Sequence, residues 1–154
     1  MDNNILFDKE WFYSVTDFCI DNNLKTWFTQ GFDARLMDRD VADRLKELPV
    51  YKGLFFAWDN VDDEDIVREK IELLKSSGIN TRRDVIFYVY CGGEYDYDSA
   101  VYRCRVLKSL NTNPFVMFNI DETPTKKINA LRRWANRKQL FWTCDISEYN
   151  RKSV

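Results

Sequence analysis

Residues 84–93 read Asp-Val-Ile-Phe-Tyr-Val-Tyr-Cys-Gly-Gly and carry the strongest strand signal in the chain. The stretch is rich in Val, Ile, Phe and Tyr, which favour strands, and the glycine pair marks its end. It does not alternate between apolar and charged residues. A continuous apolar run of this kind is typical of a strand in a parallel sheet that is buried on both faces.

The same unit recurs on both sides of this stretch, with a period of about thirty residues. Short apolar runs predict further strands at residues 24–29, 53–58 and 114–118, and a fifth strand at residues 140–142. Between them, apolar side chains recur at helical spacing, as in Val41, Ala42, Leu45 and Leu48, in Ile66, Val67, Ile71 and Leu74, in Ala100, Cys104, Leu107 and Leu110, and in Ile128, Leu131, Trp134 and Ala135. Strands that alternate with amphipathic helices predict an α/β fold of parallel βα repeats with right-handed crossovers.

The sequence predicts one domain over residues 1–154. A leading helix at residues 8–23 has a stripe of large residues at Trp11, Val15, Phe18 and Cys19, and repeated βα units fill residues 24–143. Residues 144–154 form a polar tail.

Several residues mark helix ends. Asp38 is an N-cap candidate, Gly78 fits a C′ position, and Thr123 with Pro124 fits an N-cap followed by Pro. The acidic run at residues 62–65 fits the first turn of a helix, where negative charge favours the macrodipole, and we assign it no metal.

Composition excludes several kinds of chemistry. The chain has no histidine, which removes Ser-His-Asp, Cys-His and His-metal sites. Its four cysteines, Cys19, Cys91, Cys104 and Cys144, lie too far apart for a zinc knuckle or a cluster loop, and we expect free thiols in the reducing cytosol. The apolar runs are too short to cross a membrane, and the net charge of -2 gives no overall attraction to nucleic acid or anionic lipid.

Polar loops follow the predicted strands at residues 30–35, 58–60, 91–96 and 119–122. The carboxyl ends of parallel strands meet at one edge, so these loops predict a rim that binds a polar ligand. Asp33 and Arg35 would project to one side and either pair with each other or share a ligand. For each loop, caps and turns are the alternative: Asp59 and Asn60 as caps, Gly92 and Gly93 as a turn.

A basic segment at residues 126–138 contains Lys126, Lys127, Arg132, Arg133, Arg137 and Lys138 around Trp134. A solvated helix face explains this pattern most simply. The alternative is contact with the phosphates of RNA or DNA. No G-x-G-x-x-G or Walker pattern is present, which disfavours nucleotide binding by those routes.

The order of these stretches resembles the C-terminal half of the barrel of radical S-adenosylmethionine (radical SAM) enzymes, from about Leu24 to Tyr149. The resemblance is carried by four stretches: Phe-Thr-Gln-Gly-Phe-Asp-Ala-Arg-Leu at 28–36, similar to that group's N-Q-G-L-D-x-R-L; Phe-Phe-Ala-Trp-Asp-Asn at 55–60; Val-Ile-Phe-Tyr-Val-Tyr-Cys-Gly at 85–92; and Asn-Pro-Phe-Val-Met at 113–117.

The resemblance implies a partial TIM-like barrel, about half to two-thirds of a radical SAM barrel. Its rim would hold part of S-adenosylmethionine and substrate: Gln30, Asp33 and Arg35 at polar groups, Asp59 and Asn60 at the ribose or amino acid part. The segment from Tyr88 to Gly92 and Gly93 would lie by the adenine.

The sequence departs from the family in one respect, because the C-x3-C-x2-C loop that binds the [4Fe–4S] cluster is absent. The chain would therefore be catalytic only with a cluster-bearing N-terminal half or partner subunit. Missing first strands would leave an open sheet edge, which predicts a homodimer through that edge. The alternative function is a non-catalytic α/β module that binds a protein or nucleic acid.

Overall fold

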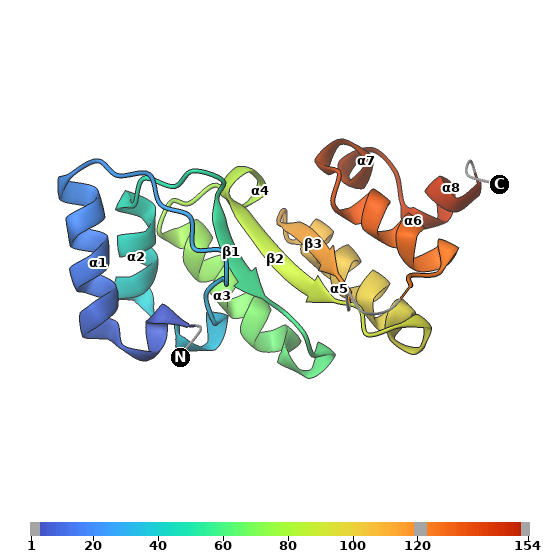
Figure 1. The fold of residues 1–154 in the computed structure, drawn as a ribbon, viewed down its shortest axis with the longest axis horizontal. Helices are drawn as coiled ribbons and strands as arrows, with labels where there is room; N and C mark the ends of the chain where they lie inside the picture. The colour runs from blue at the N-terminus through green and yellow to red at the C-terminus, as the bar shows by residue number, and fades with distance from the viewer. Residues whose placement is uncertain (1–3, 119–122, 152–154) are drawn as a thin grey trace.

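The computed structural model describes residues 4–118 and 123–151, and the α/β class is confirmed there (Figure 1). Three strands form one parallel sheet in the order β1-β2-β3. The strands are β1 (Leu54–Ala57), β2 (Val85–Tyr90) and β3 (Asn113–Met117). The α-helices are α1 (Lys9–Asp21), α2 (Arg39–Glu47), α3 (Glu64–Ser76), α4 (Thr81–Asp84), α5 (Tyr97–Ser109), α6 (Lys126–Ala135), α7 (Lys138–Thr143) and α8 (Ile146–Arg151).

The expected caps form at two helices. Asp38 accepts a hydrogen bond from the Val41 amide at the start of α2. At the end of α3, Gly78 has φ +84°, and the amides of Gly78 and Ile79 donate to the carbonyls of Lys75 and Leu74. These two bonds make a Schellman motif, which requires a residue that tolerates the left-handed region.

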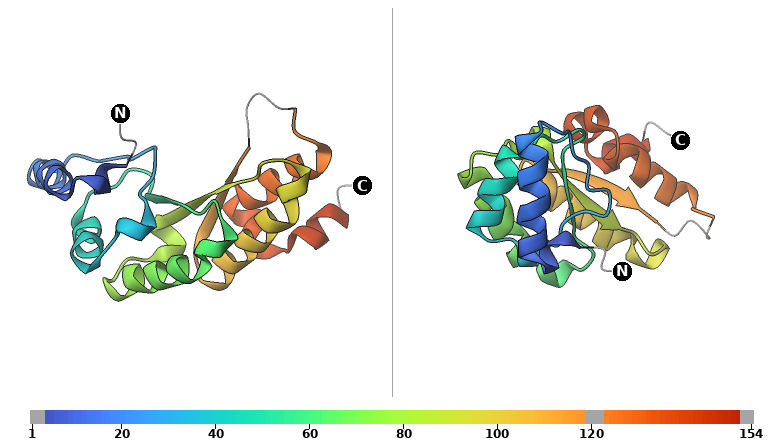
Figure 2. Two further views of the ribbon diagram at one scale, coloured as in Figure 1. Left: turned by 90° about the horizontal axis from the view of Figure 1, so that it is seen from below. Right: turned by 60° about the vertical axis from the view of Figure 1, so that its left-hand side comes forward.

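In the part of the chain that the structure describes, helices cover one face of the sheet. Figure 2 shows α3 and α5 packed along one side of the strands, and no helix of the described chain lies over the middle of the other side. Leu54, Phe56, Phe87, Val89 and Val116 are buried on the helix side.

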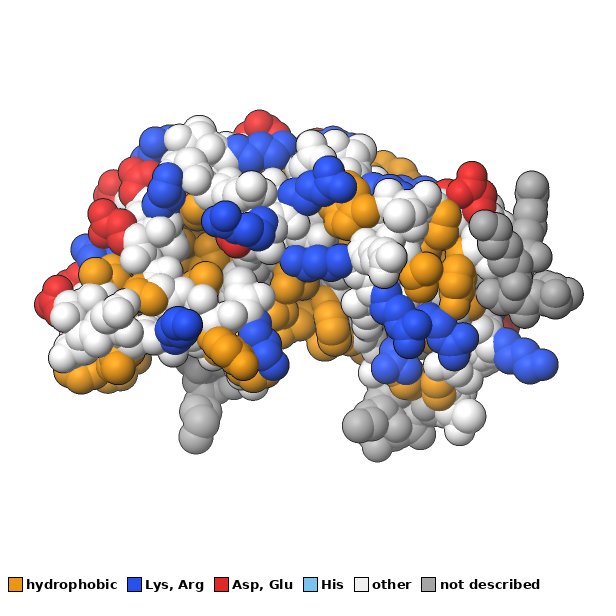
Figure 3. Space-filling view, turned by 90° about the horizontal axis from the view of Figure 1, so that it is seen from above, with side chains coloured by type: hydrophobic (Ala, Val, Ile, Leu, Met, Phe, Trp, Pro, Cys, Tyr) orange, Lys and Arg blue, Asp and Glu red, His pale blue; other side chains and the backbone are white. Residues whose placement is uncertain are grey.

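The opposite side, here called the open face, carries Ile86, Tyr88, Tyr90, Phe115 and Met117. Tyr90 and Phe115 are each 40% exposed. Figure 3 shows hydrophobic side chains gathered in a hollow between the two ends of the molecule, with Lys and Arg side chains on both sides of it.

Both edges of the sheet have partners within the chain. At the β1 edge, Phe32 forms an isolated parallel bridge with Phe56, and its amide donates to the Phe55 carbonyl. At the β3 edge, the Asn136 side chain accepts from the Val116 amide at 2.7 Å and donates to the Val116 carbonyl at 3.0 Å. These contacts occupy part of each edge, and the edge-to-edge homodimer stays a prediction.

Three sequence predictions about secondary structure are wrong. Residues 24–29 form only an isolated bridge from Thr26 to Val50, because Thr26 bonds to the backbone of Pro49 and Tyr51, which lie before β1 and outside the sheet. Residues 140–142 lie in α7, since so short an apolar run fits a buried helical turn as well as a strand. The cap of α6 is Thr125, two residues after the predicted Thr123. The sequence pattern also did not indicate that the polar tail includes a helix, α8.

The leading helix matches its predicted position, but its large residues are not all in the core. Phe12 and Thr16 are buried, whereas Trp11 and Phe18 are exposed. The side of α1 that packs into the core is therefore not the side that carries the predicted stripe of large residues. Within the described part of the chain, none of the helices has the length and apolarity that a bilayer crossing requires.

Candidate functional site at the carboxyl end of β1

A pocket of about 320 Å³ opens at the carboxyl end of β1. It is lined by five of the eight residues predicted from the sequence: Gln30, Asp33, Arg35, Asp59 and Asn60. The bridge from Phe32 to Phe56 fixes the first loop beside β1, and β1 itself leads into the second loop. The polar loops before α2 and after β1 thus converge, as expected for the strand ends of a parallel sheet.

Asp33 and Arg35 form an ion pair inside the pocket lining. The Arg35 Nη2 lies 2.6 Å from Asp33 Oδ2, and its Nε lies 2.9 Å from Oδ1. The side-chain hydrogen bonds from Arg35 lower the pKa of the Asp33 carboxyl, so it is ionised at neutral pH. All three side-chain hydrogen bonds of Arg35 are to this one carboxylate, which sets the orientation of the guanidinium plane.

The pocket also holds carboxylates that this pair does not neutralise. Asp59 and Asp63 both line it, and neither forms an ion pair with a described residue. Asp33 and, to a smaller extent, Asp63 raise the pKa of the Arg35 guanidinium. The pocket therefore has more negative than positive groups and favours a ligand with a positive centre.

Asn60 serves as a cap. Its Oδ1 accepts from the Asp62 amide at 3.1 Å, and its backbone carbonyl accepts from the Trp58 indole at 2.6 Å. These contacts hold the start of a 3-10 turn at Val61–Asp63, just before α3. Asn60 thus shapes the pocket wall, and the Asp59 side chain is left to face outward.

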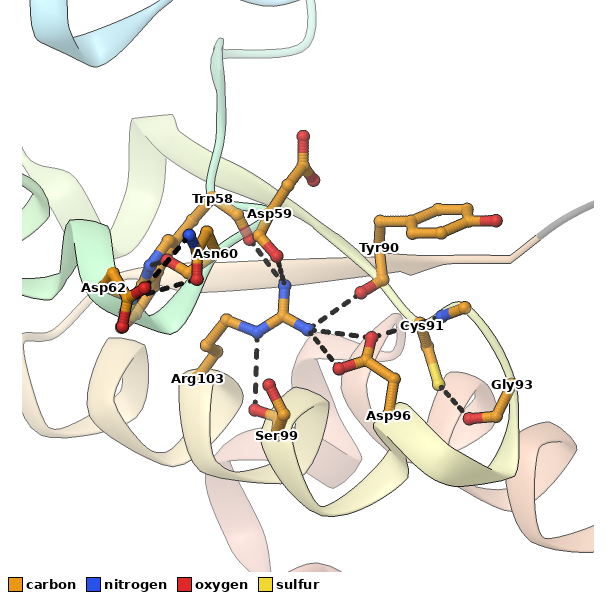
Figure 4. A network of polar contacts seen from close by, with 11 residues as sticks. Trp58, Asp59, Asn60, Asp62, Tyr90, Cys91, Gly93, Asp96, Ser99 and Arg103 are labelled. Carbon is orange, nitrogen blue, oxygen red and sulfur yellow. Dashed lines mark hydrogen bonds and ion pairs between the residues drawn. The ribbon is translucent and has the colours of Figure 1, made fainter.

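A buried arginine that we did not predict organises this edge of the sheet. Arg103 of α5 is 0% exposed and donates to the carbonyls of Trp58 at 2.8 Å, Asp59 at 2.9 Å and Tyr90 at 2.9 Å (Figure 4). Its Nη2 also lies 3.1 Å from Asp96 Oδ2. One guanidinium therefore joins the ends of β1 and β2 to the start of α5.

The sequence gives one weak signal for this role. Arg103 lies between Ala100 and Cys104, which both point into the core, so a helical projection places it on the buried side of α5. Buried arginines are rare unless their donors are satisfied, and strand-end carbonyls supply the acceptors here. Arg103 is a positioning residue, because it contacts the pocket only through the backbone of Asp59.

The other three predicted residues lie outside the pocket. Tyr88 lies on the open face, stacks on Phe55 at 5.3 Å, and donates its hydroxyl to the Thr29 carbonyl at 2.9 Å. Burial raises the pKa of the Tyr88 phenol. Tyr88 therefore anchors the segment that carries Gln30.

Gly92 and Gly93 form the turn after β2. The Gly92 amide donates to Asp96 Oδ2 at 3.2 Å, and Gly93 has φ +142°, where side chains other than glycine are rarely found. Their contacts support the interpretation of a turn. The predicted loop at residues 119–122 lies outside the described residues.

The pocket lining also includes residues that the sequence did not indicate. Asn4 and Phe7, which precede α1, reach the same pocket as Ile66 and Val67 of α3. Contacts between residues this distant along the chain cannot be inferred from local pattern. Phe7, Ile66 and Val67 add apolar side chains to the pocket lining.

Comparison of the chain with protein-family models, curated protein sequences and solved structures finds no match.

Proposed function

We propose that the chain is the C-terminal part of a radical SAM-type domain, a portion of a partial TIM-like barrel that contributes binding groups for S-adenosylmethionine and substrate. The observation that carries the proposal is the pocket at the end of β1, where Gln30, Asp33, Arg35, Asp59 and Asn60 meet. The strand order also supports it, since parallel strands in chain order with helices on one face recur in barrels of this kind.

The pocket fits part of S-adenosylmethionine chemically. The ligand has a positive sulfonium and ammonium, which suit Asp59 and Asp63, and a carboxylate, which suits the Arg35 guanidinium. The ribose hydroxyls are donors for the Asp59 carboxylate. A volume of about 320 Å³ is at the lower end for a small-molecule site, so the rest of the ligand would extend over the open face.

The [4Fe–4S] cluster does not fit this chain. In the described ranges, no group of three or more His, Cys, Asp or Glu side chains could hold a metal. Cys91 and Cys104 are buried, and burial raises the pKa of both thiols, which disfavours the thiolate form that ligates iron. In the proposal, three thiolates from another segment or partner hold the cluster, and no radical step is assigned to the residues described here.

Titration of the 154-residue chain with S-adenosylmethionine, followed by calorimetry and amide NMR shifts, tests the proposal. We expect shifts at residues 30–35 and 57–60, and a loss of at least about tenfold in affinity for Asp59→Ala, which removes a charged hydrogen-bond acceptor worth roughly 1.5–3 kcal/mol. The matched control is Asp65→Ala, an exposed carboxylate in the first turn of α3 that does not line the pocket. Absence of binding, or equal binding by both variants, would contradict the proposal.

A further inference from the structure

Charge is unevenly distributed along the chain. Residues 123–144 contain six Lys and Arg and no Asp or Glu, whereas the other 132 residues contain 17 Lys and Arg and 25 Asp and Glu. We call the six cations the basic surface: Lys126, Lys127, Arg132, Arg133, Arg137 and Lys138. The net charge of -2 hides this separation, and the basic surface is the segment whose charge most favours a polyanion.

The basic surface also differs from the rest of the molecule in how its cations are bonded. Elsewhere ten Lys and Arg side chains form ion pairs with carboxylates of the described residues. None of the six does so with a described residue. Lys127 lies over Tyr97 at 3.9 Å, Arg132 lies over Phe118 at 4.2 Å, and Lys138 donates to the Arg83 carbonyl. Ring faces and a carbonyl orient these three cations, and no carboxylate of residues 4–118 or 123–151 forms an ion pair with them.

The arginines line a hollow beside the sheet. Asn129, Arg132, Arg133, Asn136 and Arg137 enclose about 290 Å³. The Asn136 amide is bonded to Val116 of β3, so the hollow follows the β3 edge.

The same edge borders the open face. Phe115 and Met117 flank Val116 in β3 and point to that face, where they are 40% and 36% exposed. Tyr90 lies opposite Met117 in the sheet register and is 40% exposed. The hollow lined by these arginines is thus joined through Asn136 to the strand that carries Phe115 and Met117. Figure 3 shows Lys and Arg side chains beside the hydrophobic hollow.

We propose that this region binds single-stranded nucleic acid, with phosphates on Arg133 and Arg137 and bases stacked on Phe115 and Tyr90. Guanidinium groups match the geometry of phosphate oxygens, and aromatic faces stack on any base. A duplex hides its base faces and would use only the cations. The inference goes beyond the proposed function and does not depend on it, because it uses neither the β1 pocket nor a cluster.

Fluorescence anisotropy with labelled 20-nucleotide RNA and DNA tests the inference on the 154-residue chain. We expect binding at low salt that weakens as salt rises, and a loss of at least about tenfold for the double variant Arg133→Glu/Arg137→Glu, whose two lost phosphate contacts would flatten the salt slope by roughly 1.4. The control Arg39→Glu/Lys75→Glu changes the net charge equally, at paired cations on α2 and α3.

A second pair of variants tests the stacking. Phe115→Ala should weaken binding about five- to 150-fold, the range for loss of one stacked base. Phe18→Ala, which removes an exposed ring on α1, should not. Circular dichroism of each variant ensures that only folded protein is compared.

Four results would overturn the inference: no binding of either oligonucleotide at about 50 mM salt, equal losses in the two double variants, equal affinity for duplex and single strand, or competition by polyglutamate as strong as by the oligonucleotide. A preference for RNA or for DNA would support the inference and identify which nucleic acid binds. Failure here would leave S-adenosylmethionine binding at the β1 pocket unaffected, so the two proposals fail separately.

Discussion

The two faces of the β1–β2–β3 sheet carry similar side chains in different surroundings. On the helix side, Phe56 and Phe87 stack at 5.3 Å and are fully buried under helices. On the open face, Tyr88 and Phe115 meet edge to face at 5.9 Å, and Phe115 remains 40% exposed. Exposed apolar patches of this kind mark binding surfaces. The comparison therefore separates residues that stabilise the fold from residues that are available to a ligand or partner.

The largest expected effect comes from truncating one ring on each face. Phe87→Ala should lower the free energy of unfolding by about 3–5 kcal/mol, because it leaves a cavity in the packed side of the sheet. Phe115→Ala should cost about 1 kcal/mol or less, because its ring is partly in water and loses mainly one aromatic contact. Urea unfolding followed by circular dichroism measures both. Equal losses would show that the open face is packed as tightly as the covered one.

Arg103 is the polar counterpart of the covered core. Arg103→Leu should lower the free energy of unfolding by about 3 kcal/mol. The substitution leaves three backbone carbonyls and the Asp96 carboxylate without the donor that they bond to. Arg105→Leu, two residues further along α5, removes an exposed ion pair with Asp145. It should lower the free energy of unfolding by about 0–1 kcal/mol. Urea unfolding of the two variants gives the comparison. A smaller loss for Arg103→Leu than for Arg105→Leu would contradict the role assigned to Arg103.

The smallest effect is a pH dependence at the pair of Arg105 and Asp145. Hydrogen bonds from Arg105 lower the pKa of the Asp145 carboxyl far below its usual range. A lowered folded-state pKa stabilises the fold above the unfolded value of about 3.9 and loses that contribution as pH falls toward the folded value.

Because both side chains are partly exposed, the contribution is about 1 kcal/mol at most. The difference in unfolding free energy between the natural chain and Arg105→Gln should be constant near neutral pH and shrink below about pH 4. Urea unfolding at a series of pH values checks this. A difference that does not change with pH would show that the ion pair adds nothing.

Local pattern predicted the regular part of the molecule well. The strands around residues 54–57, 85–90 and 113–117 and the helices α2, α3 and α5 lie where apolar period and caps placed them. The same pattern failed for the short run at 140–142, where three apolar residues fit a helix as well as a strand. It also failed to choose the inner side of α1, because Trp11 and Phe12 neighbour each other and only packing decides which is buried.

The candidate site was partly predictable for the same reason. The loops that contain Asp33 and Asp59 follow from strand order, because the ends of parallel strands share one edge. The role of Arg103 could not be predicted from the sequence, because its acceptors are carbonyls at the ends of two strands that are distant along the chain. The open face could not be predicted either. A continuous apolar strand indicates that both faces of the sheet are covered, but it does not indicate whether the same chain supplies the covering segments.

The central claim is that ligands use the rim and the open face, and that the helix-covered face only supports them. The most direct measurement is a residue-resolved NMR titration of the folded chain with S-adenosylmethionine and then with a single-stranded oligonucleotide. The account predicts shifts around Asp59 for the first ligand and around Phe115 and Arg133 for the second, with Phe87 and Leu107 of the covered side unchanged. Shifts centred on the covered side, or no shifts with either ligand, would contradict it.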